Sequence, residues 1–322
     1  MVLRRYNDLI LFVIFAILTQ SAVAQSYPAK PIRIIAAVAP GSGPDIISRL
    51  IGAKLTEAWK QQVIVDNRPG ASGNLGAEIA ARAAPDGYTL LMVTASQPIA
   101  ATLFPKLNYD LMRDFSPVSL LAFTPFLLVV NNSVAANSAL ELIALAKARP
   151  GALRYGSGGS GSPPHLAAEM LRSQTGIDIL HVPYKSIAPA LSELVAGQIH
   201  FAISVVSTVL PLTRSGKLRA LAVTSARRTP LVPELPTLAE TLPGYQLTGW
   251  YGLVAPAGTP REIVARLNEA SVRIVKSADM QERLSALGAE ASGSTPVEFA
   301  AHLRGEIQRL GKAVRDSGAR AE

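Results

Sequence analysis

The sequence of 322 residues contains no cysteine. The chain therefore forms no disulfide and has no thiolate nucleophile and no lipid-anchored N-terminal cysteine. Aromatic residues are also scarce, at 6%, whereas 49% of the residues are hydrophobic, which predicts a core of aliphatic side chains and alanine. A chain of this length buries such a core without disulfides, and its length favours two domains or one large two-lobed unit.

Long apolar runs are missing too. Beyond the N-terminus, no stretch reaches the roughly 20 residues of a membrane-spanning helix without a charge, a proline or a glycine. The N-terminus has the three parts of a secretion signal: basic Arg4 and Arg5, the apolar run 9–18, and the cleavage pattern Ala22-Val23-Ala24. We predict that residues 1–24 are a signal peptide, cleaved after about Ala24, and that the protein is exported.

Motifs for catalysis are also missing. The sequence has no G-x-S-x-G elbow, and no P-loop lysine follows a glycine cluster. His165 and Glu169 are spaced to face one metal ion, but no third ligand is indicated, so a histidine at a helix start beside a solvated glutamate is expected instead. We therefore predict no enzyme activity, no cofactor and no metal; an exported enzyme acting on anionic substrates stays open as an alternative.

The formal net charge is +8, and removing Arg4, Arg5 and Asp8 with the leader leaves +7. The basic residues are scattered and are not interleaved with aromatic residues, which argues against nucleic acid as a partner. The charge suits anionic ligands or a membrane surface, but a solvated basic surface without such a partner is the favoured explanation.

Strand-like and helix-like segments alternate along most of the chain, which favours an α/β fold with largely parallel sheets. The expected strands are 31–38, 63–65, 89–93, 126–130, 179–182, 201–203, 220–224 and 252–254, and the expected helices are 47–58, 75–84, 139–148, 165–175, 188–196, 261–276 and 296–317. The apolar strands 126–130 and 252–254 bracket a central portion of the chain. We predict one lobe from residues 25–125 plus 246–322 and a second lobe from 126–245.

Two glycine-rich segments each follow a strand and precede a helix. The first runs from Val38 to Asp45 and the second from Tyr155 to His165. A glycine-containing loop at a helix start exposes backbone N–H groups where the helix dipole is positive, which suits a carboxylate or a phosphate. Both segments are therefore predicted to bind an anion; for the second, a flexible connecting loop is the alternative. Its glycines fit G-x-G-x-x-G literally, but the preceding strand is short and no acidic residue ends the next strand, so dinucleotide binding is not expected.

Two further segments are less decisive. Residues 66–74 are predicted to form a structural turn, with Asn74 as the N-cap of the next helix. Trp250 and Tyr251 lie beside the predicted crossover between lobes, where they either wall a cleft or fill the hinge.

Several segments together resemble one family. These are Tyr27-Pro28-x-Lys30-Pro31-Ile32-Arg33, the loop 40–45, Asp66-Asn67-Arg68-Pro69-Gly70, Pro85-Asp86-Gly87-Tyr88, Pro164-His165-Leu166-Ala167, Val182-Pro183-Tyr184-Lys185, and the runs 216–224 and 253–260. With these segments the mature chain resembles substrate-binding receptors of the tripartite tricarboxylate transporter family, also called the Bug or TctC family.

The resemblance implies a periplasmic, two-lobed α/β binding protein of type II, with a hinged ligand cleft. It implies a small organic acid as ligand, a membrane permease as partner and a monomeric state; a sensor that signals to a membrane kinase is an alternative. Carried onto this sequence, the ligand-binding residues are Pro40, Gly41, Ser42, Gly43 and Asp45 in one lobe, with Ser160, Gly161, Ser162, Tyr184 and Ser204 in the other.

The chain departs from the family pattern at several of these positions. Ser42 replaces a glycine, Pro163 a serine or threonine, and Ser186-Ile187 a Gly-Gly pair. His200 and Ser204 stand where aspartates are usual. Because these departures remove acidic groups expected in the cleft, we predict an organic acid without an amino group.

Overall fold

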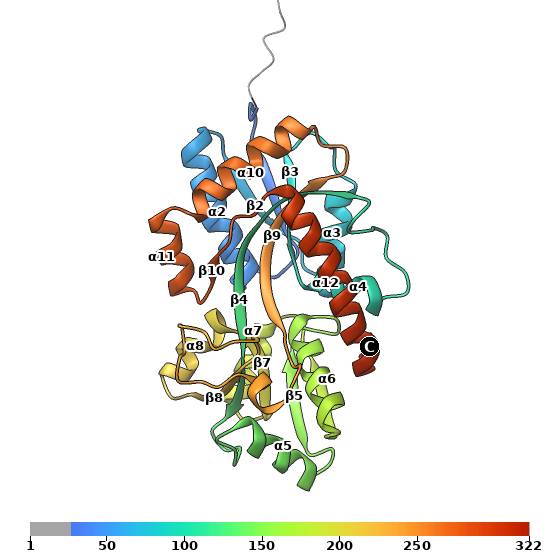
Figure 1. Cartoon of the computed structure of the whole chain (residues 1–322), viewed down its shortest axis with the longest axis vertical. Helices are drawn as coiled ribbons and strands as arrows, with labels where there is room; N and C mark the ends of the chain where they lie inside the picture. The colour runs from blue at the N-terminus through green and yellow to red at the C-terminus, as the bar shows by residue number, and fades with distance from the viewer. Residues whose placement is uncertain (1–26, 322) are drawn as a thin grey trace, which may run out of the picture.

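The computed structural model describes residues 27–321, so the predicted signal peptide lies outside the described residues. Figure 1 shows two halves, one above the other, and two long strands that run between them. The predicted two-lobed α/β fold is confirmed. Within the described residues, no helix combines the length and apolar character needed to cross a bilayer.

The elements follow one another along the chain in a largely alternating order. The strands are β1 (Ile32–Ala36), β2 (Val63–Asn67), β3 (Thr89–Thr94), β4 (Phe115–Asn131), β5 (Leu153–Ser157), β6 (Ile179–Pro183), β7 (Phe201–Val205), β8 (Leu218–Val223), β9 (Thr248–Pro256) and β10 (Glu290–Ala291). The helices are α2 (Gly43–Trp59), η1 (Ala71–Gly73), α3 (Asn74–Ala81), α4 (Ser96–Leu103), α5 (Ala139–Ala148), α6 (Pro163–Thr175), α7 (Ile187–Val195), α8 (Val206–Arg214), α9 (Leu238–Thr241), α10 (Arg261–Val275), α11 (Ala278–Ala286) and α12 (Pro296–Ser317).

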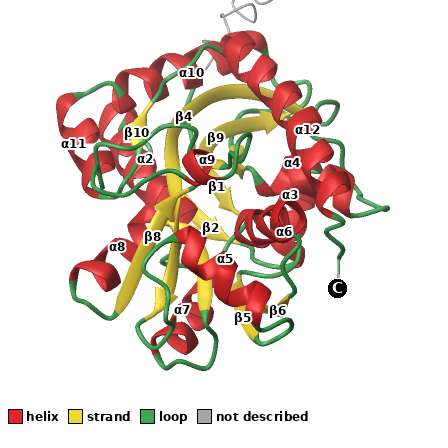
Figure 2. Ribbon diagram, turned by 60° about the horizontal axis from the view of Figure 1, so that its bottom comes forward, coloured by secondary structure: helices red, strands yellow, loops and turns green. Residues whose placement is uncertain are grey.

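Each half contains a set of three parallel strands. In the upper half of Figure 1 the order is β2-β1-β3, and in the lower half it is β6-β5-β7. Strand β1 shows why these strands are central: Ile32, Ile34 and Ile35 are completely buried, as expected for a parallel strand covered by helices on both faces. Figure 2 shows helices on both sides of the strands.

The long strand β4 belongs to both halves. Its residues Phe115–Pro125 pair with β9, which also pairs with β3 of the first half. From Phe126 onward, β4 pairs instead with β7 and β8 of the second half. The change of partners between Pro125 and Phe126 marks where the chain passes from one half to the other.

The cores lie between the strands and the helices that cover them. One continuous cluster extends through both halves and includes residues of α4, α6 and α12. A second cluster, with Ile47, Ile51 and Leu55, lies under α2 and α10, and a third lies under α7 and α8. Helix α12 packs against α4 and β4 and also against α6, so it bridges the two halves.

Most of the predicted elements are present, with some differences. Strand β4 begins at Phe115, well before the predicted start at Phe126, and α4, α8 and α11 were not predicted. The prediction that Asn74 caps α3 is wrong. The N-cap is Gly73, and the Asn74 side chain instead accepts a hydrogen bond of 2.8 Å from the Tyr109 hydroxyl.

Candidate ligand-binding cleft

The carboxyl ends of both sets of parallel strands face the junction between the halves. Ligands of α/β proteins bind at such strand ends. Contacts confirm that the loops from the two sides meet: the Ser72 hydroxyl donates to the carbonyl of Ser160. A methyl group added to Gly161 would lie 2.9 Å from Leu103, and one added to Gly43 would lie 3.7 Å from Val205.

The first predicted loop begins after β1 and ends in α2. Gly41 has φ of +79°, a left-handed conformation that glycine adopts without strain. Ser42 is the N-cap of α2 with extended backbone, yet its hydroxyl caps no N–H group. It donates instead to the carbonyl of Ala39 at 2.7 Å. The N–H groups of the first turn of α2 are therefore not occupied by the N-cap side chain.

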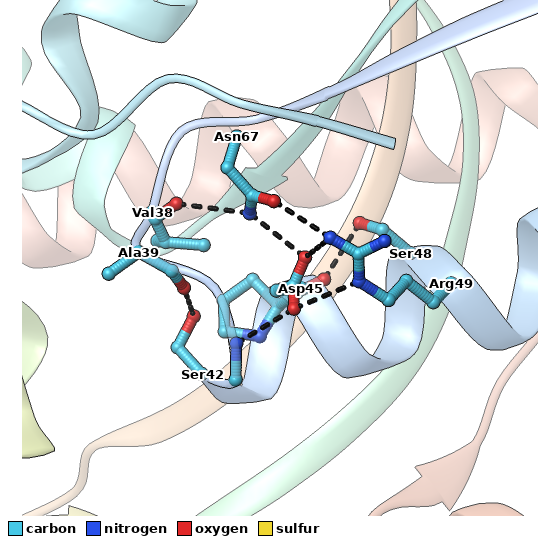
Figure 3. A network of polar contacts seen from close by, with 9 residues as sticks. Val38, Ala39, Ser42, Asp45, Ser48, Arg49 and Asn67 are labelled. Atoms are coloured by element: carbon cyan, nitrogen blue, oxygen red, sulfur yellow. Dashed lines mark hydrogen bonds and ion pairs between the residues drawn. The ribbon is translucent and has the colours of Figure 1, made fainter. Parts of the chain in front are cut away.

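Asp45 braces this loop from within (Figure 3). Its carboxylate is almost fully buried and accepts hydrogen bonds from the Gly41 N–H at 2.8 Å and from the Asn67 amide at 2.9 Å. Arg49 adds an ion pair at 3.0 Å and also bonds the Asn67 side chain at 2.8 Å. Burial alone would raise the pKa of Asp45, but the bonds from Arg49, Gly41 and Asn67 outweigh it and hold the pKa below its ordinary value. The carboxylate is ionised and engaged within the protein.

The second predicted loop, between β5 and α6, has the same kind of geometry. Gly159 and Gly161 have positive φ of +106° and +85°. Ser162 is the N-cap of α6, and its hydroxyl donates to the carbonyl of Gly159 at 2.7 Å instead of capping the helix. The hydroxyl of Ser157 lies 2.7 Å from His181 Nε2 and accepts a bond of 3.1 Å from the Gly159 N–H.

In the part of the chain that the structure describes, the α-helices that follow the strand ends at the junction are α2, α3, α4, α6, α7 and α8. The N-cap residue of each makes no side-chain hydrogen bond to its helix. The N–H groups of a helix's first turn have no partner within the helix and carry partial positive charge. Not every one of these positions has a free donor: Pro44, Pro163 and Pro164 have no N–H, and the Ser96 N–H of α4 already donates to Thr94 Oγ1 at 3.2 Å. The start of α2, with the Gly43 N–H, is therefore the part of the junction best suited to bind an anion.

Tyr184, Ser204 and His200 each have a hydrogen-bond partner within the second half. The Tyr184 hydroxyl donates to Glu193 on α7 at 3.2 Å, and burial together with Glu193 raises the pKa of the phenol. Ser204 is buried, and its hydroxyl pairs with that of Thr208 at 2.8 Å. His200 precedes β7, at the opposite end of the strand from the junction, and accepts a bond from the Arg154 N–H. Treating position 200 as part of the cleft was therefore wrong.

The predicted solvated glutamate beside His165 is also wrong. Glu169 is buried, accepts a bond of 2.8 Å from the Tyr155 hydroxyl and pairs with Arg172 at 2.6 Å. Among the residues that the structure describes, no group of three acidic, histidine or cysteine side chains is placed to hold a metal ion.

Sequence reasoning missed Ser72 as a contact between the halves. Ala71 and Ser72 both have positive φ, of +46° and +55°, although neither is glycine. Such conformations cost of order 1 kcal/mol each and are concentrated at functional sites. The glycines on either side, Gly70 and Gly73, were the available signal of an unusual turn.

Trp250 and Tyr251 are both buried in β9, which decides between the two alternatives for this pair. The Trp250 indole donates to Glu306 on α12 at 2.8 Å. The Tyr251 hydroxyl lies directly behind Gly43, 2.6 Å from where a β-carbon would stand. Both rings fill the crossover, and Tyr251 supports the first loop from behind.

Comparison with known proteins agrees with this geometry. The family described as "Tripartite tricarboxylate transporter family receptor" matches residues 47–318. The chain belongs to this family. The BugT protein of Bordetella pertussis is 36% identical over 313 residues, which cover 96% of this chain and 96% of BugT.

Solved structures of similar proteins show the same fold. An R. palustris protein solved with adipate is 36% identical, with a TM-score of 0.88 over 92% of this chain and 100% of that chain. MatC from Rhodopseudomonas palustris, solved with bound malate, is 34% identical, with a TM-score of 0.84 over 89% of this chain and 100% of that chain. The receptor family and its periplasmic compartment thus agree with the predictions from sequence.

Proposed function

We propose that this receptor captures a small dicarboxylate in the periplasm and delivers it to the membrane component of a tripartite tricarboxylate transporter. The observation that carries the proposal is the convergence of helix starts without side-chain caps on the junction between the lobes. Adipate and malate in the two similar structures are both dicarboxylates, which supports this ligand class.

The ligand is proposed to lie between the loop 40–45 and the loop 160–162. Ser42 and Gly43 stand at the start of α2 and Ser162 at the start of α6, and backbone N–H groups bind ionised carboxylates more strongly than neutral groups. The proposed donor of α2 is the Gly43 N–H, because Pro44 has none, and Pro163 and Pro164 leave the first two positions of α6 without an N–H. Asp45 is bonded to Arg49 and Asn67, so it is not available as a partner for a ligand ammonium group. This favours an organic acid without an amino group.

Two lobes, of residues 25–125 plus 246–322 and of 126–245, are proposed to close on the ligand. The change of strand partners at Pro125–Phe126 supports the first boundary. Closing excludes water, which strengthens hydrogen bonds to the carboxylate. We also propose that the protein binds its ligand without converting it, that it is a monomer, and that residues 1–24 are removed as a signal peptide.

A binding panel tests the proposal. Calorimetry with the purified mature protein compares adipate, malate and succinate with aspartate, glutamate, phosphate and methanesulfonate. We expect a dicarboxylate to bind most tightly and to raise the melting temperature in proportion to its affinity. Mass spectrometry of the recovered ligand should show it unchanged. Tightest binding of an amino acid, or chemical conversion of the ligand, would overturn the proposal.

A further inference from the structure

The two anion-binding loops share a short internal repeat. Gly41-Ser42-Gly43-Pro44-Asp45 in the first half corresponds to Gly161-Ser162-Pro163-Pro164-His165 in the second. In each, a glycine with φ near +80° precedes an extended N-cap serine, a proline stands in the first helical turn, and a polar side chain occupies the third helical position.

The hydrogen bonds of the two repeats also correspond. Each N-cap serine donates its hydroxyl at 2.7 Å to the carbonyl three residues before it. Each glycine N–H donates to the side chain at the third helical position: Gly41 to Asp45 Oδ2 at 2.8 Å and Gly161 to His165 Nδ1 at 3.3 Å. In a capping box this side chain would bond the N–H of the N-cap residue itself. Here it bonds the residue before, and the serine hydroxyl, which donates to a loop carbonyl, leaves the first helical turn without a side-chain cap.

We propose that Asp45 and His165 are equivalent positioning residues, which hold the two loops in the conformation that places the first turns of α2 and α6 at the proposed cleft. This rests on the proposed function for the identity of the cleft. Neither side chain is needed as a ligand contact, because each is buried and bonded to its own loop.

The two residues differ in how they respond to protons. Asp45 accepts its bonds as an anion beside Arg49. His165 accepts only while Nδ1 carries no proton. Its ring lies 4.4 Å from that of His181 on β6, with Glu169 and Arg172 nearby on α6, and the ring of Tyr155 on β5 stacks on His181. Helix α12 contributes the Ser317 carbonyl, which accepts from Arg172. Burial and His181 lower the pKa of His165 to about 4, so it is neutral at ordinary pH.

Amide exchange in the ligand-free protein tests the positioning role directly. Protein NMR would follow the Gly41 and Gly161 amides in wild type, Asp45→Ala, Asp45→Asn, His165→Ala and His165→Gln. Each alanine variant should accelerate exchange of its own glycine amide at least tenfold and leave the other unchanged, whereas Asn and Gln keep an acceptor and restore protection. The Gly161 amide shift of wild type should titrate with a midpoint near pH 4, and His165→Gln should abolish this titration.

The affinity measurement uses the dicarboxylate that binds tightest in the panel. Both alanine variants should lose at least tenfold in affinity, and the Asn and Gln variants should recover most of it. Unchanged amide exchange in the alanine variants, or unchanged affinity despite faster exchange, would overturn the inference. If no dicarboxylate binds wild type, the proposed function fails, while the exchange pattern still decides whether the repeat works as described. If Asp45→Ala does not fold, amide exchange and affinity are compared with wild type in Asp45→Asn, His165→Ala and His165→Gln.

Discussion

Two groups of helices in this receptor begin in different ways. Away from the cleft, α5, α9, α11 and α12 have Ser or Thr N-caps whose side chains accept a first-turn N–H. At the cleft, α2 and α6 also have serine N-caps with extended backbone, but both hydroxyls turn back to a loop carbonyl. The same residue type thus caps a helix in one place and leaves the first helical turn without a side-chain cap in the other.

The largest expected effect comes from filling the space behind the first loop. In Gly43→Ala, the new methyl group would lie 2.6 Å from the buried Tyr251 hydroxyl. We expect the free energy of unfolding to fall by about 1–3 kcal/mol, as for other overpacked sites, and ligand affinity to fall with it. Urea unfolding and calorimetry measure both.

Two further variants make this test specific. Tyr251→Phe combined with Gly43→Ala should recover most of the loss, because the clashing oxygen is gone. Gly305→Ala on α12, where nothing lies within 4 Å of the new methyl group, should be neutral or stabilising. Equal losses in Gly43→Ala and Gly305→Ala would show that the contact with Tyr251 is unimportant.

The next effect is a dependence of stability on pH that comes from the second loop. An unfolded histidine takes up its proton near pH 6.5, whereas folded His165 stays neutral to about pH 4. Its contribution to stability is therefore complete above about pH 6.5 and is lost as the pH falls toward 4, at no more than roughly 1.4 kcal/mol per pH unit. Urea unfolding between pH 7 and pH 4 should show a smaller slope for His165→Gln than for wild type.

Asp45 provides the matched control for that measurement. Its pKa is lowered in the folded state, so its contribution is complete above the unfolded value of about 3.9 and is lost only below it. Asp45→Asn should therefore leave the slope between pH 7 and pH 5 unchanged. If Asp45→Asn instead reduced the slope between pH 7 and pH 5, the pH dependence of stability would come from the first loop and not from His165.

A helix start away from the cleft should affect stability alone. Thr295 and Glu298 form a complete capping box at the start of α12. Thr295→Ala should lower the free energy of unfolding by about 1 kcal/mol, because one N–H group loses its partner. The dissociation constant of the tightest dicarboxylate should stay within twofold of wild type. A large loss of affinity would mean that α12 contributes to the ligand site.

The smallest effect on stability is expected at the cleft serines. Ser42→Ala and Ser162→Ala remove no helix cap, since neither hydroxyl bonds a helix N–H. We expect a loss of about 0.5 kcal/mol from the bond to the loop carbonyl, together with a several-fold loss of affinity. Thermal unfolding measures the loss of stability, and calorimetry measures the loss of affinity. A stability loss larger than that of Thr295→Ala would remove the distinction between the two kinds of helix start.

Much of the fold followed from the sequence because short aliphatic runs, such as the buried strand Ile32–Ala36, indicate strands. Apart from α11, the elements that were missed or predicted too short contain prolines. Pro117 and Pro125 lie within β4, Pro98 within α4 and Pro211 within α8. In β4, shifts in register around Pro117 and Leu120 accommodate the irregularity, and such shifts depend on the partner strand.

The site was predicted less completely because it depends on contacts between distant residues. Glycine and serine at two helix starts indicated the loops themselves. Asn67, which donates to Asp45, lies at the end of another strand, β2. Ser72 contacts Ser160 only after the two lobes have folded. The directions of Tyr184 and Ser204 also depend on partners, Glu193 and Thr208, which the loop sequences do not reveal.

The placement of α12 limits how the receptor can open. Its end is tied to α6 by bonds from Arg172 to the Ser317 carbonyl and from Ser173 to the Asp316 carbonyl, while its body packs on α4 of the other lobe. Separating the lobes along this side would break these bonds and expose apolar surface. We therefore expect the lobes to open by rotating about the side on which α12 lies. The solute should then enter and leave on the opposite side.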